Sequence, residues 1–257
     1  MIPEWAWGEI PVGFKKLHPQ RARMIVVREA LEPYLDAERF FDEAKSAEQT
    51  SPFHGRGQIC LYRFDNGEAA LVRAYRHGGM LRDVTGHFFF TWPPRPFREL
   101  AVTEEVRRRG VPTPEVLGAC VERIWGPFYR GWLLSRELTG GHDFWAALRN
   151  RLSTDPVAAP LIEAVARGLG TMHCRGVYHA DLNLKNILVR HERSEIKSYI
   201  IDFDKARLFP GAVPPHRVEK NLRRLYRSVR KLDPDRRWLP EKDWRLLVRC
   251  YREAEEK

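Results

Sequence analysis

One short segment, YHADLNLKNILV at Tyr178–Val189, constrains this chain more than any other part of it. It places Asp181 five residues before Asn186 and runs directly into an apolar, β-prone stretch. A second apolar stretch follows and ends in Asp-Phe-Asp, of which Asp202 is the first residue. Two carboxylates and one carboxamide at the ends of short hydrophobic strands can hold metal ions and deprotonate a hydroxyl. The spacing predicts strand, turn and returning strand, with these three side chains at one edge.

A single aspartate in a loop is usually a cap or a turn residue, but the full spacing favours a catalytic interpretation. Asp181 is then the candidate base, and Asn186 with Asp202 the candidate metal ligands. His179 is expected to orient the loop by hydrogen bonding, and Phe203 to pack behind Asp202. For Asp204, a solvated or capping role is preferred over a second metal ligand.

The first half of the chain predicts a hairpin that follows two glycines. The apolar residues of 59–64 and 69–75 read as strands, and Asp65-Asn66-Gly67 between them is a hairpin-turn signal. Gly55 and Gly57 would let backbone amides approach phosphate oxygens, although such a pair also suits a flexible turn. Arg73, inside the second strand, is a candidate phosphate contact. The alternative is that its guanidinium reaches out to water.

A helix is predicted over 98–109, with Gly110 as its stop signal. Of its glutamates, Glu99 on the first turn is the expected partner for a basic residue on a neighbouring strand. Two further strands are expected within 111–124 and 130–138. The aromatic cluster FFFTW at 88–92 is interpreted as packing between lobes, with a lipid-facing patch as the less favoured alternative.

The remaining periodicity is helical. Helices are expected over Glu29–Ala47, His142–Arg151 and Pro160–Arg175, and 191–197 is expected to be a polar turn. In the tail, Leu222, Leu225, Val229 and Leu232 share one helix face opposite a basic side. The chain is therefore predicted to be α+β and two-lobed. Residues 1–138 would form a β-rich lobe with one main helix, and 139–257 a small, mostly helical lobe.

The bulk composition excludes several classes of protein. The 257 residues include four scattered cysteines without a Cys-x-x-Cys pair, which argues against a zinc site or a disulfide framework. The N-terminus lacks the apolar core of a signal peptide, and no run is long enough to span a bilayer, so a cytoplasmic protein is expected. The net charge of +10 indicates an anionic partner or, equally, an arginine-rich composition that follows from a GC-rich genome. The basic residues are dispersed without a recognition module, so nucleic acid is the least favoured partner.

These motifs resemble the protein-kinase-like superfamily. HADLNLKN is similar to its catalytic loop, IDFD to its metal-binding segment, and ALVR to the strand that carries its phosphate-binding lysine. Several positions depart from the pattern, because Ala180 replaces an arginine, Asn183 a lysine, Asp204 a glycine and Arg73 the lysine. The short stretch after Asp202 leaves no room for a peptide-binding lobe, which argues against a protein kinase.

A closer resemblance covers most of the chain. HADLN-x-x-NIL, IDFDKAR, the run from Arg73 to Gly79 and the tail NLRRLYRSVRKL are similar to the lipopolysaccharide core kinases, most of all to 3-deoxy-D-manno-octulosonic acid (Kdo) kinases. Heptose kinases of the same group are the rival. The resemblance implies ATP, Mg²⁺ and a Kdo residue on anionic lipid A. It also implies a cytoplasmic enzyme peripherally attached to the bacterial inner membrane.

In such an enzyme Arg73 would contact the α- and β-phosphates, and Glu99 would position it. Gly55 and Gly57 would shape the lid over ATP, and the backbone near Glu137 would bind adenine. Lys185, Lys205 and Arg207 are the candidates for binding acceptor phosphates or carboxylate. Two other functions stay open, a soluble small-molecule kinase of the aminoglycoside or choline type and a nucleotide-binding pseudokinase scaffold.

Overall fold

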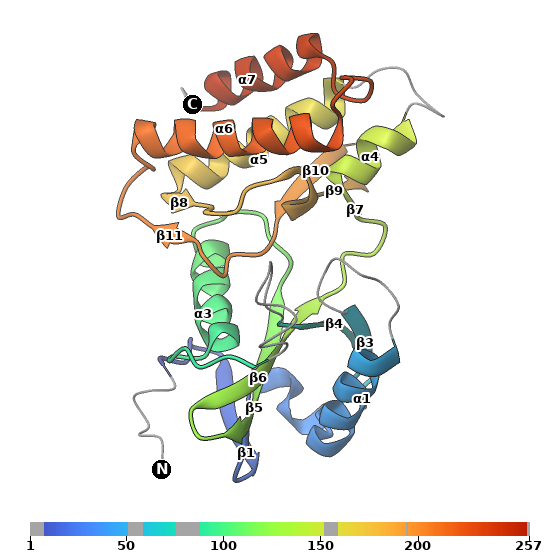
Figure 1. Ribbon diagram of the computed structural model, residues 1–257, viewed down its shortest axis with the longest axis vertical. Coiled ribbons are helices and arrows are strands. Elements are labelled where there is room, and N and C mark those ends of the chain that lie inside the picture. Colours follow the sequence, from blue (N-terminus) through green and yellow to red (C-terminus); the bar gives the residue numbers. More distant parts are fainter. Residues whose placement is uncertain (1–7, 51–58, 76–87, 152–158, 194, 256–257) are drawn as a thin grey trace. The chain divides into compact units, whose positions relative to one another are not determined.

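The computed structural model describes residues 8–50, 59–75, 88–151, 159–193 and 195–255. The chain divides into two compact units (Figure 1). The first unit comprises residues 1–104 and 115–137, and the second comprises residues 105–114 and 138–257. Each unit has its own sheet and helices, so the predicted α+β class is confirmed.

The first unit is built on one six-stranded antiparallel sheet. Its strand order is β1-β2-β5-β6-β4-β3. The strands are β1 (Phe14–Gln20), β2 (Arg23–Arg28), β3 (Ile59–Arg63), β4 (Ala69–Ala74), β5 (Val116–Trp125) and β6 (Phe128–Arg136). Gly67, at φ 84°, allows the expected turn between β3 and β4. The pair β1 and β2 was not expected, although the buried run Met24–Val27 is its signal.

Two helices complete the two hydrophobic clusters of this unit. Helix α1 (Ala37–Thr50) contributes Phe40 and Phe41, which pack with Trp132 of β6 in one cluster. Helix α3 (Arg95–Arg108) contributes Phe97 and Leu100 to the other. The predicted single helix over Glu29–Ala47 is wrong in its first part. Residues Glu29–Tyr34, which include Pro33, form a short 3-10 helix, η2, before α1 begins.

The second unit is mostly helical. Its helices are α4 (Phe144–Arg151), α5 (Ala159–Cys174), α6 (Pro215–Leu232) and α7 (Glu241–Glu255). A three-stranded sheet has the order β10-β9-β7, and a two-stranded sheet pairs β11 with β8. These strands are β7 (His142–Asp143), β8 (Val177–Tyr178), β9 (Ile187–Glu192), β10 (Glu195–Ile200) and β11 (Arg207–Leu208). Residues 105–114 belong here because Pro112 accepts a backbone hydrogen bond from Ile200, at 3.0 Å.

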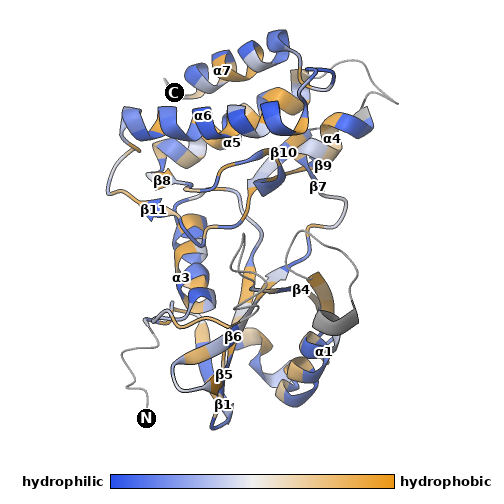
Figure 2. Cartoon of the chain, in the orientation of Figure 1, coloured by the Kyte–Doolittle hydropathy of each residue, from blue (hydrophilic) through white to orange (hydrophobic). Residues whose placement is uncertain are grey.

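Two expectations about this unit need correction, and one helix was missed. The helix expected from His142 begins at Phe144, because His142 and Asp143 pair with β9. The polar segment 191–197 is largely strand, since β9 and β10 continue their antiparallel pairing to Glu192 and Glu195. Helix α7 was not predicted at all. Along α6 the buried side chains are Val218, Asn221, Leu225 and Val229, while the basic side is hydrophilic (Figure 2).

Gly168 provides a test of the packing between α5 and β10. A Cβ atom at this position would lie 2.1 Å from the Ser198 hydroxyl, which donates a 2.8 Å hydrogen bond to the Ala164 carbonyl. We expect Gly168→Ala to destabilise the protein by about 1 kcal/mol, because the hydroxyl must give up that bond. In a Ser198→Ala background the same change should stabilise by up to about 1 kcal/mol through helix propensity. Denaturant unfolding of the protein with and without Gly168→Ala, in both the Ser198 and the Ser198→Ala backgrounds, measures the sign of the change in unfolding free energy.

The matched control is Gly211→Ala, since an added Cβ there meets nothing within 4 Å. It should change the free energy of unfolding by less than about 0.5 kcal/mol. The same sign for Gly168→Ala in both backgrounds would contradict the packing described here.

Candidate active site

The loop that follows β8 is held in shape by its own asparagines. Asn183 accepts a hydrogen bond from the Lys185 amide at 3.0 Å and so caps the short 3-10 helix η4 (Leu184–Asn186). The Asp181 carbonyl accepts two side-chain amides, from Asn183 at 2.9 Å and from Asn186 at 3.0 Å. The Asp181 side chain is left 61% exposed. The loop therefore fixes the backbone of Asp181 while its carboxylate stays accessible.

Asp202 is tied to this loop through the backbone. The Ile201 amide donates to the Asn186 carbonyl at 3.0 Å, just beyond the end of β10. Asp202 itself has φ 71°, in the left-handed region that residues other than glycine seldom adopt. Such a conformation costs roughly 1 kcal/mol or more and persists only where the surroundings enforce it. The hairpin β9–β10 thus brings Asn186 next to the segment that carries Asp202.

His179 links the two segments and has a defined tautomer. Its Nδ1 accepts the Asp181 amide at 3.1 Å, so its Nε2 carries the proton and donates to the Ile201 carbonyl at 2.9 Å. The ring packs against Phe203, with centroids 5.3 Å apart. His179 therefore orients both Asp181 and the backbone before Asp202, as expected from the sequence. Asp204, by contrast, is buried rather than solvated.

A buried polar residue of α6, Asn221, fixes the start of the loop. Its carbonyl oxygen accepts the His179 amide at 3.2 Å, and its amide nitrogen donates to the His179 carbonyl at 2.6 Å. The same carbonyl oxygen accepts Nε2 of His173 at 3.0 Å, and Nδ1 of His173 pairs with the Tyr251 hydroxyl at 2.8 Å. The loop is thereby connected to α5, α6 and α7. Sequence reasoning missed this network.

Burial keeps both histidines of this network neutral. Desolvation lowers the pKa of His173 to about 4, and the neighbouring His179 adds to the shift, although the Asn221 hydrogen bond opposes it. Desolvation also lowers the pKa of His179, against its hydrogen bond to Ile201 and the nearby carboxylates of Asp202 and Asp181. A protonated ring would lose its acceptor nitrogen, so the network as drawn requires both rings uncharged.

One cation from α6 approaches the candidate base. Arg224 Nη1 lies 3.4 Å from Asp181 Oδ1, in a partly exposed pair. Sequence reasoning assigned no residue to this contact. The pair matters because Asn183 stands where the resemblance led us to look for a lysine, so the positive charge beside Asp181 comes from another element.

The first unit contains the second part of the predicted constellation. On β4, Arg73 Nη2 donates to both carboxylate oxygens of Glu99 on α3, at 2.6 and 2.7 Å. The Tyr75 hydroxyl also hydrogen-bonds this carboxylate, and Glu99 is buried. Glu104 pairs with Arg28 instead, at 2.7 Å. Glu99 is thus the helix glutamate that meets Arg73.

For the other predicted site residues, the described part of the chain shows no contact that tests the predicted role. Gly55 and Gly57 lie outside the described residues. Glu137 follows β6 and is exposed. In the second unit, Lys205 and Arg207 are exposed on the segment after Phe203, and Lys185 is half-buried in η4. The structure therefore leaves the proposed adenine and acceptor contacts as predictions.

Oxygen donors near Asp202 suit a magnesium ion. Within the described part of the chain, no group of three or more His, Cys, Asp and Glu side chains could hold a metal by itself. Magnesium does not need one, because it usually binds one or two protein side chains together with substrate phosphates and water. Asn186 donates through its amide nitrogen to Asp181, which reserves its carbonyl oxygen as a ligand. The donor set therefore fits the ion.

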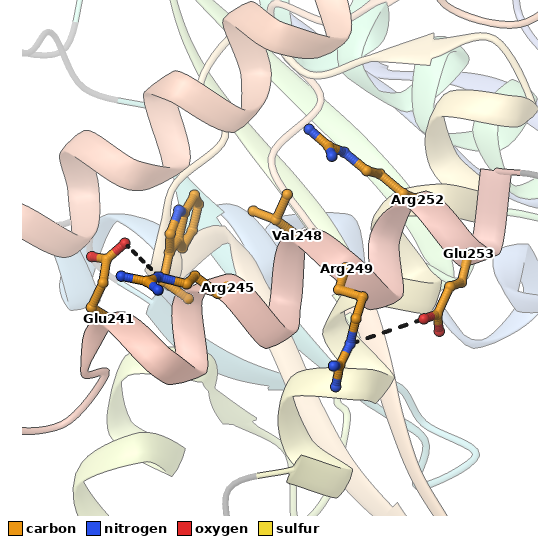
Figure 3. A pocket seen from close by; sticks show the side chains of 7 residues that line it. Glu241, Arg245, Val248, Arg249, Arg252 and Glu253 are labelled. Atoms are coloured by element: carbon orange, nitrogen blue, oxygen red, sulfur yellow. Dashed lines mark ion pairs between the residues drawn. The ribbon is translucent and has the colours of Figure 1, made fainter.

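Two surface pockets of the second unit lie away from these residues. One, of about 450 Å³, runs along α7 (Figure 3), where Arg245 and Arg249 pair with Glu241 and Glu253. The other, of about 730 Å³, lies on the β9–β10 hairpin and is lined by Thr139 and charged side chains. Asp181, Asn186 and Asp202 line neither pocket.

The fold resembles that of a solved structure, WaaP in complex with acyl carrier protein. The two share 18% sequence identity with a TM-score of 0.58, over 90% of each chain. This likeness concerns the fold alone, and it confirms the predicted protein-kinase-like class.

The sequence comparisons define the family. Residues 45–251 match the model described as the lipopolysaccharide kinase (Kdo/WaaP) family. The 3-deoxy-D-manno-octulosonic acid kinase of Mannheimia succiniciproducens is 30% identical, over 77% of this chain and 82% of its own. A protein of the same name from Vibrio vulnificus is 33% identical, over 77% and 80%. The chain therefore belongs to the lipopolysaccharide kinase (Kdo/WaaP) family, which makes it a phosphotransferase that uses ATP and acts on a sugar hydroxyl.

The buried histidines predict a pH dependence of stability. In the unfolded chain His173 binds a proton below its ordinary pKa of 6.5, whereas in the folded chain it does so only near 4. The unfolded state thus binds more protons in this window, so stability is complete above pH 6.5 and falls as the pH drops towards 4. His173 alone should account for about 3 kcal/mol over this range.

Urea unfolding at several pH values measures the effect. His173→Gln should lower stability at neutral pH but flatten the slope below pH 6.5. The control is His191→Gln, because His191 is exposed on β9. A His173→Gln variant with the wild-type slope would show that His173 does not titrate as the buried network requires.

Proposed function

We propose that the protein transfers the γ-phosphoryl group of ATP to a hydroxyl of a Kdo residue attached to lipid A. The observation that carries the proposal is the loop in which hydrogen bonds hold Asp181, Asn186 and the segment before Asp202 together. The relatives named Kdo kinase, matched over 77% of the chain, support the acceptor. Residues 1–138 would form the lobe that binds the phosphates, and 139–257 the lobe that carries the base.

Asp181 acts on the acceptor in this proposal. Its exposed carboxylate accepts the proton of the attacking hydroxyl, and His179 and Asn221 hold the backbone from which it projects. The Arg224 guanidinium beside it can stabilise negative charge on the transferred group or on the acceptor. Lys185, Lys205 and Arg207 are proposed to bind acceptor phosphates or carboxylate.

Asn186 and Asp202 are proposed to hold Mg²⁺, which would bridge the phosphates and neutralise their charge. Arg73 would contact the α- and β-phosphates. Its Nη2 donates to both carboxylate oxygens of buried Glu99, which holds the guanidinium group in position on β4. Gly55 and Gly57 would shape the lid, and the backbone near Glu137 would bind adenine.

The lipid part of the acceptor implies work at the cytoplasmic face of the inner membrane. Among the residues that the structure describes, no helix is both long and apolar enough to cross a bilayer. The attachment that we propose is peripheral, through contact with anionic lipid. A heptose of the lipopolysaccharide core is the alternative acceptor, and the experiment below separates the two.

The decisive experiment is an acceptor screen with labelled ATP and Mg²⁺ on Kdo-lipid A, heptosylated core and an aminoglycoside. We expect transfer to Kdo-lipid A, and a loss of about 10²–10⁴-fold in kcat for Asp181→Asn, because the base is removed while the loop shape is kept. The control is Asp235→Asn, an exposed aspartate of the connection between α6 and α7. Transfer to heptose alone would show that heptose, not Kdo, is the acceptor. Wild-type rates for Asp181→Asn would contradict the assignment of Asp181 as the base.

The ion pair of Arg73 with Glu99 has a matched control in a second ion pair between α3 and the sheet. Arg73→Ala should raise the KM for ATP by about tenfold or more, since it removes a charge-assisted phosphate contact. Glu104→Gln also breaks an ion pair between α3 and the sheet, that with Arg28, and should leave the KM for ATP unchanged. Steady-state kinetics with varied ATP measures both variants. Equal effects would mean that Arg73 acts only through stability.

A further inference from the structure

One end of the first sheet exposes large aromatic rings that the catalytic proposal does not use. Trp125 is 73% exposed to solvent and Phe90 is 63% exposed. Ile124, beside Trp125, is also exposed. We call these three residues, with Phe128, the aromatic end.

The local backbone explains why these rings face outward together. Phe89 and Tyr129 exchange two backbone hydrogen bonds of 2.8 Å, which adds residues 88–90 to the edge of β6 as a short bridge. Because side chains alternate along extended backbone, buried Phe89 and Tyr129 point inward and their neighbours point outward. The cluster FFFTW therefore does not pack as a block, since Phe89 lies in the core of this unit and Phe90 outside it.

The exposed rings form one preorganised surface. The Trp125 and Phe128 rings are stacked, with centroids 5.5 Å apart and planes 10° apart. Phe90 meets Phe128 edge-on at 6.0 Å. The surface lies at the turn that joins β5 to β6, at the lower left of Figure 1. A projecting turn whose rings are already in place can insert into a fluid environment without a conformational change.

The charges beside the rings are positive. Arg123 and Arg130 flank the turn in sequence, and the Arg123 amide bonds to the Ala22 carbonyl at 2.7 Å, which brings exposed Arg21 to the same end. The neighbouring acidic residue, Glu122, is buried and pairs with Arg23 and Lys45. By contrast, arginines of the α7 pocket are offset by glutamates on the same helix (Figure 3).

We propose that the aromatic end docks on an anionic phospholipid bilayer, with Trp125 and Phe90 in the headgroup region. Tryptophan favours that region, and adjacent arginines attract acidic headgroups. The aromatic end has four residues, far fewer than the roughly 20–30 residues per partner of a stable protein interface, whereas a few aromatic rings suffice at a membrane interface. The inference rests on the proposed function for its membrane-borne acceptor.

Vesicle co-sedimentation of the full chain tests the proposal. Vesicles of phosphatidylcholine with phosphatidylglycerol should bind the wild type, and phosphatidylcholine alone should bind it more weakly. Trp125→Ser combined with Phe90→Ser should weaken binding about tenfold or more, because two interfacial rings are lost. The matched control is Tyr34→Ser, since Tyr34 is another exposed aromatic residue of the same unit.

Each outcome decides a separate question. Unchanged binding of the double variant overturns the assignment of this surface. If the wild type binds neither kind of vesicle, the proposal of a lipid partner is wrong, and an acidic protein becomes the favoured partner of the aromatic end. The double variant should keep wild-type kcat on an acceptor in detergent but show a raised KM on vesicles. Vesicle binding through the aromatic end without transfer to any Kdo acceptor would uphold this inference and overturn the proposed function.

Discussion

The loop from His179 to Asn186 depends on one buried carboxamide, that of Asn221. A loop that must present Asp181 to solvent cannot also be held by a hydrophobic core, so it needs buried hydrogen bonds. Asn221 supplies both a donor and an acceptor to the backbone of His179 and continues through His173 to Tyr251. Each member has one matched role, so the loss of any one leaves a buried polar group unpaired, which costs about 1–3 kcal/mol. The loop is thus rigid while the carboxylate of Asp181, the proposed base, stays exposed.

The two groups of proposed site residues are held in different ways. In the first unit a direct ion pair fixes Arg73, because Glu99 is buried and also bound by Tyr75. In the second unit neutral hydrogen bonds fix the backbone, and Asp202 is held in a left-handed conformation. The proposed phosphate contact gains from an oriented charge, whereas the proposed base and metal ligands need an oriented backbone from which their side chains project. The proposed mechanism uses this difference.

The sequence predicted the loop because its chemistry lies in one contiguous stretch, from His179 to Asp204. It did not predict Asn221 or Arg224, since these side chains reach the loop from a helix some forty residues further on. A signal for Asn221 was present, because it is a polar residue on the apolar stripe of Val218, Leu225 and Val229. Strands β1 and β2 were missed because basic residues interrupt the apolar alternation around Met24–Val27. Sequence patterns predict contacts between residues close together in the chain better than contacts between distant helices and strands.

The exposed rings at the β5–β6 turn also affect how the protein behaves when purified. Whatever covers Trp125 and Phe90 in the cell, water alone is a poor solvent for them, and the rings of a second molecule are an available substitute. The apparent oligomeric state of the isolated protein should therefore vary with detergent and concentration. An oligomer observed in the absence of lipid or detergent would therefore depend on the solvent as much as on the protein itself.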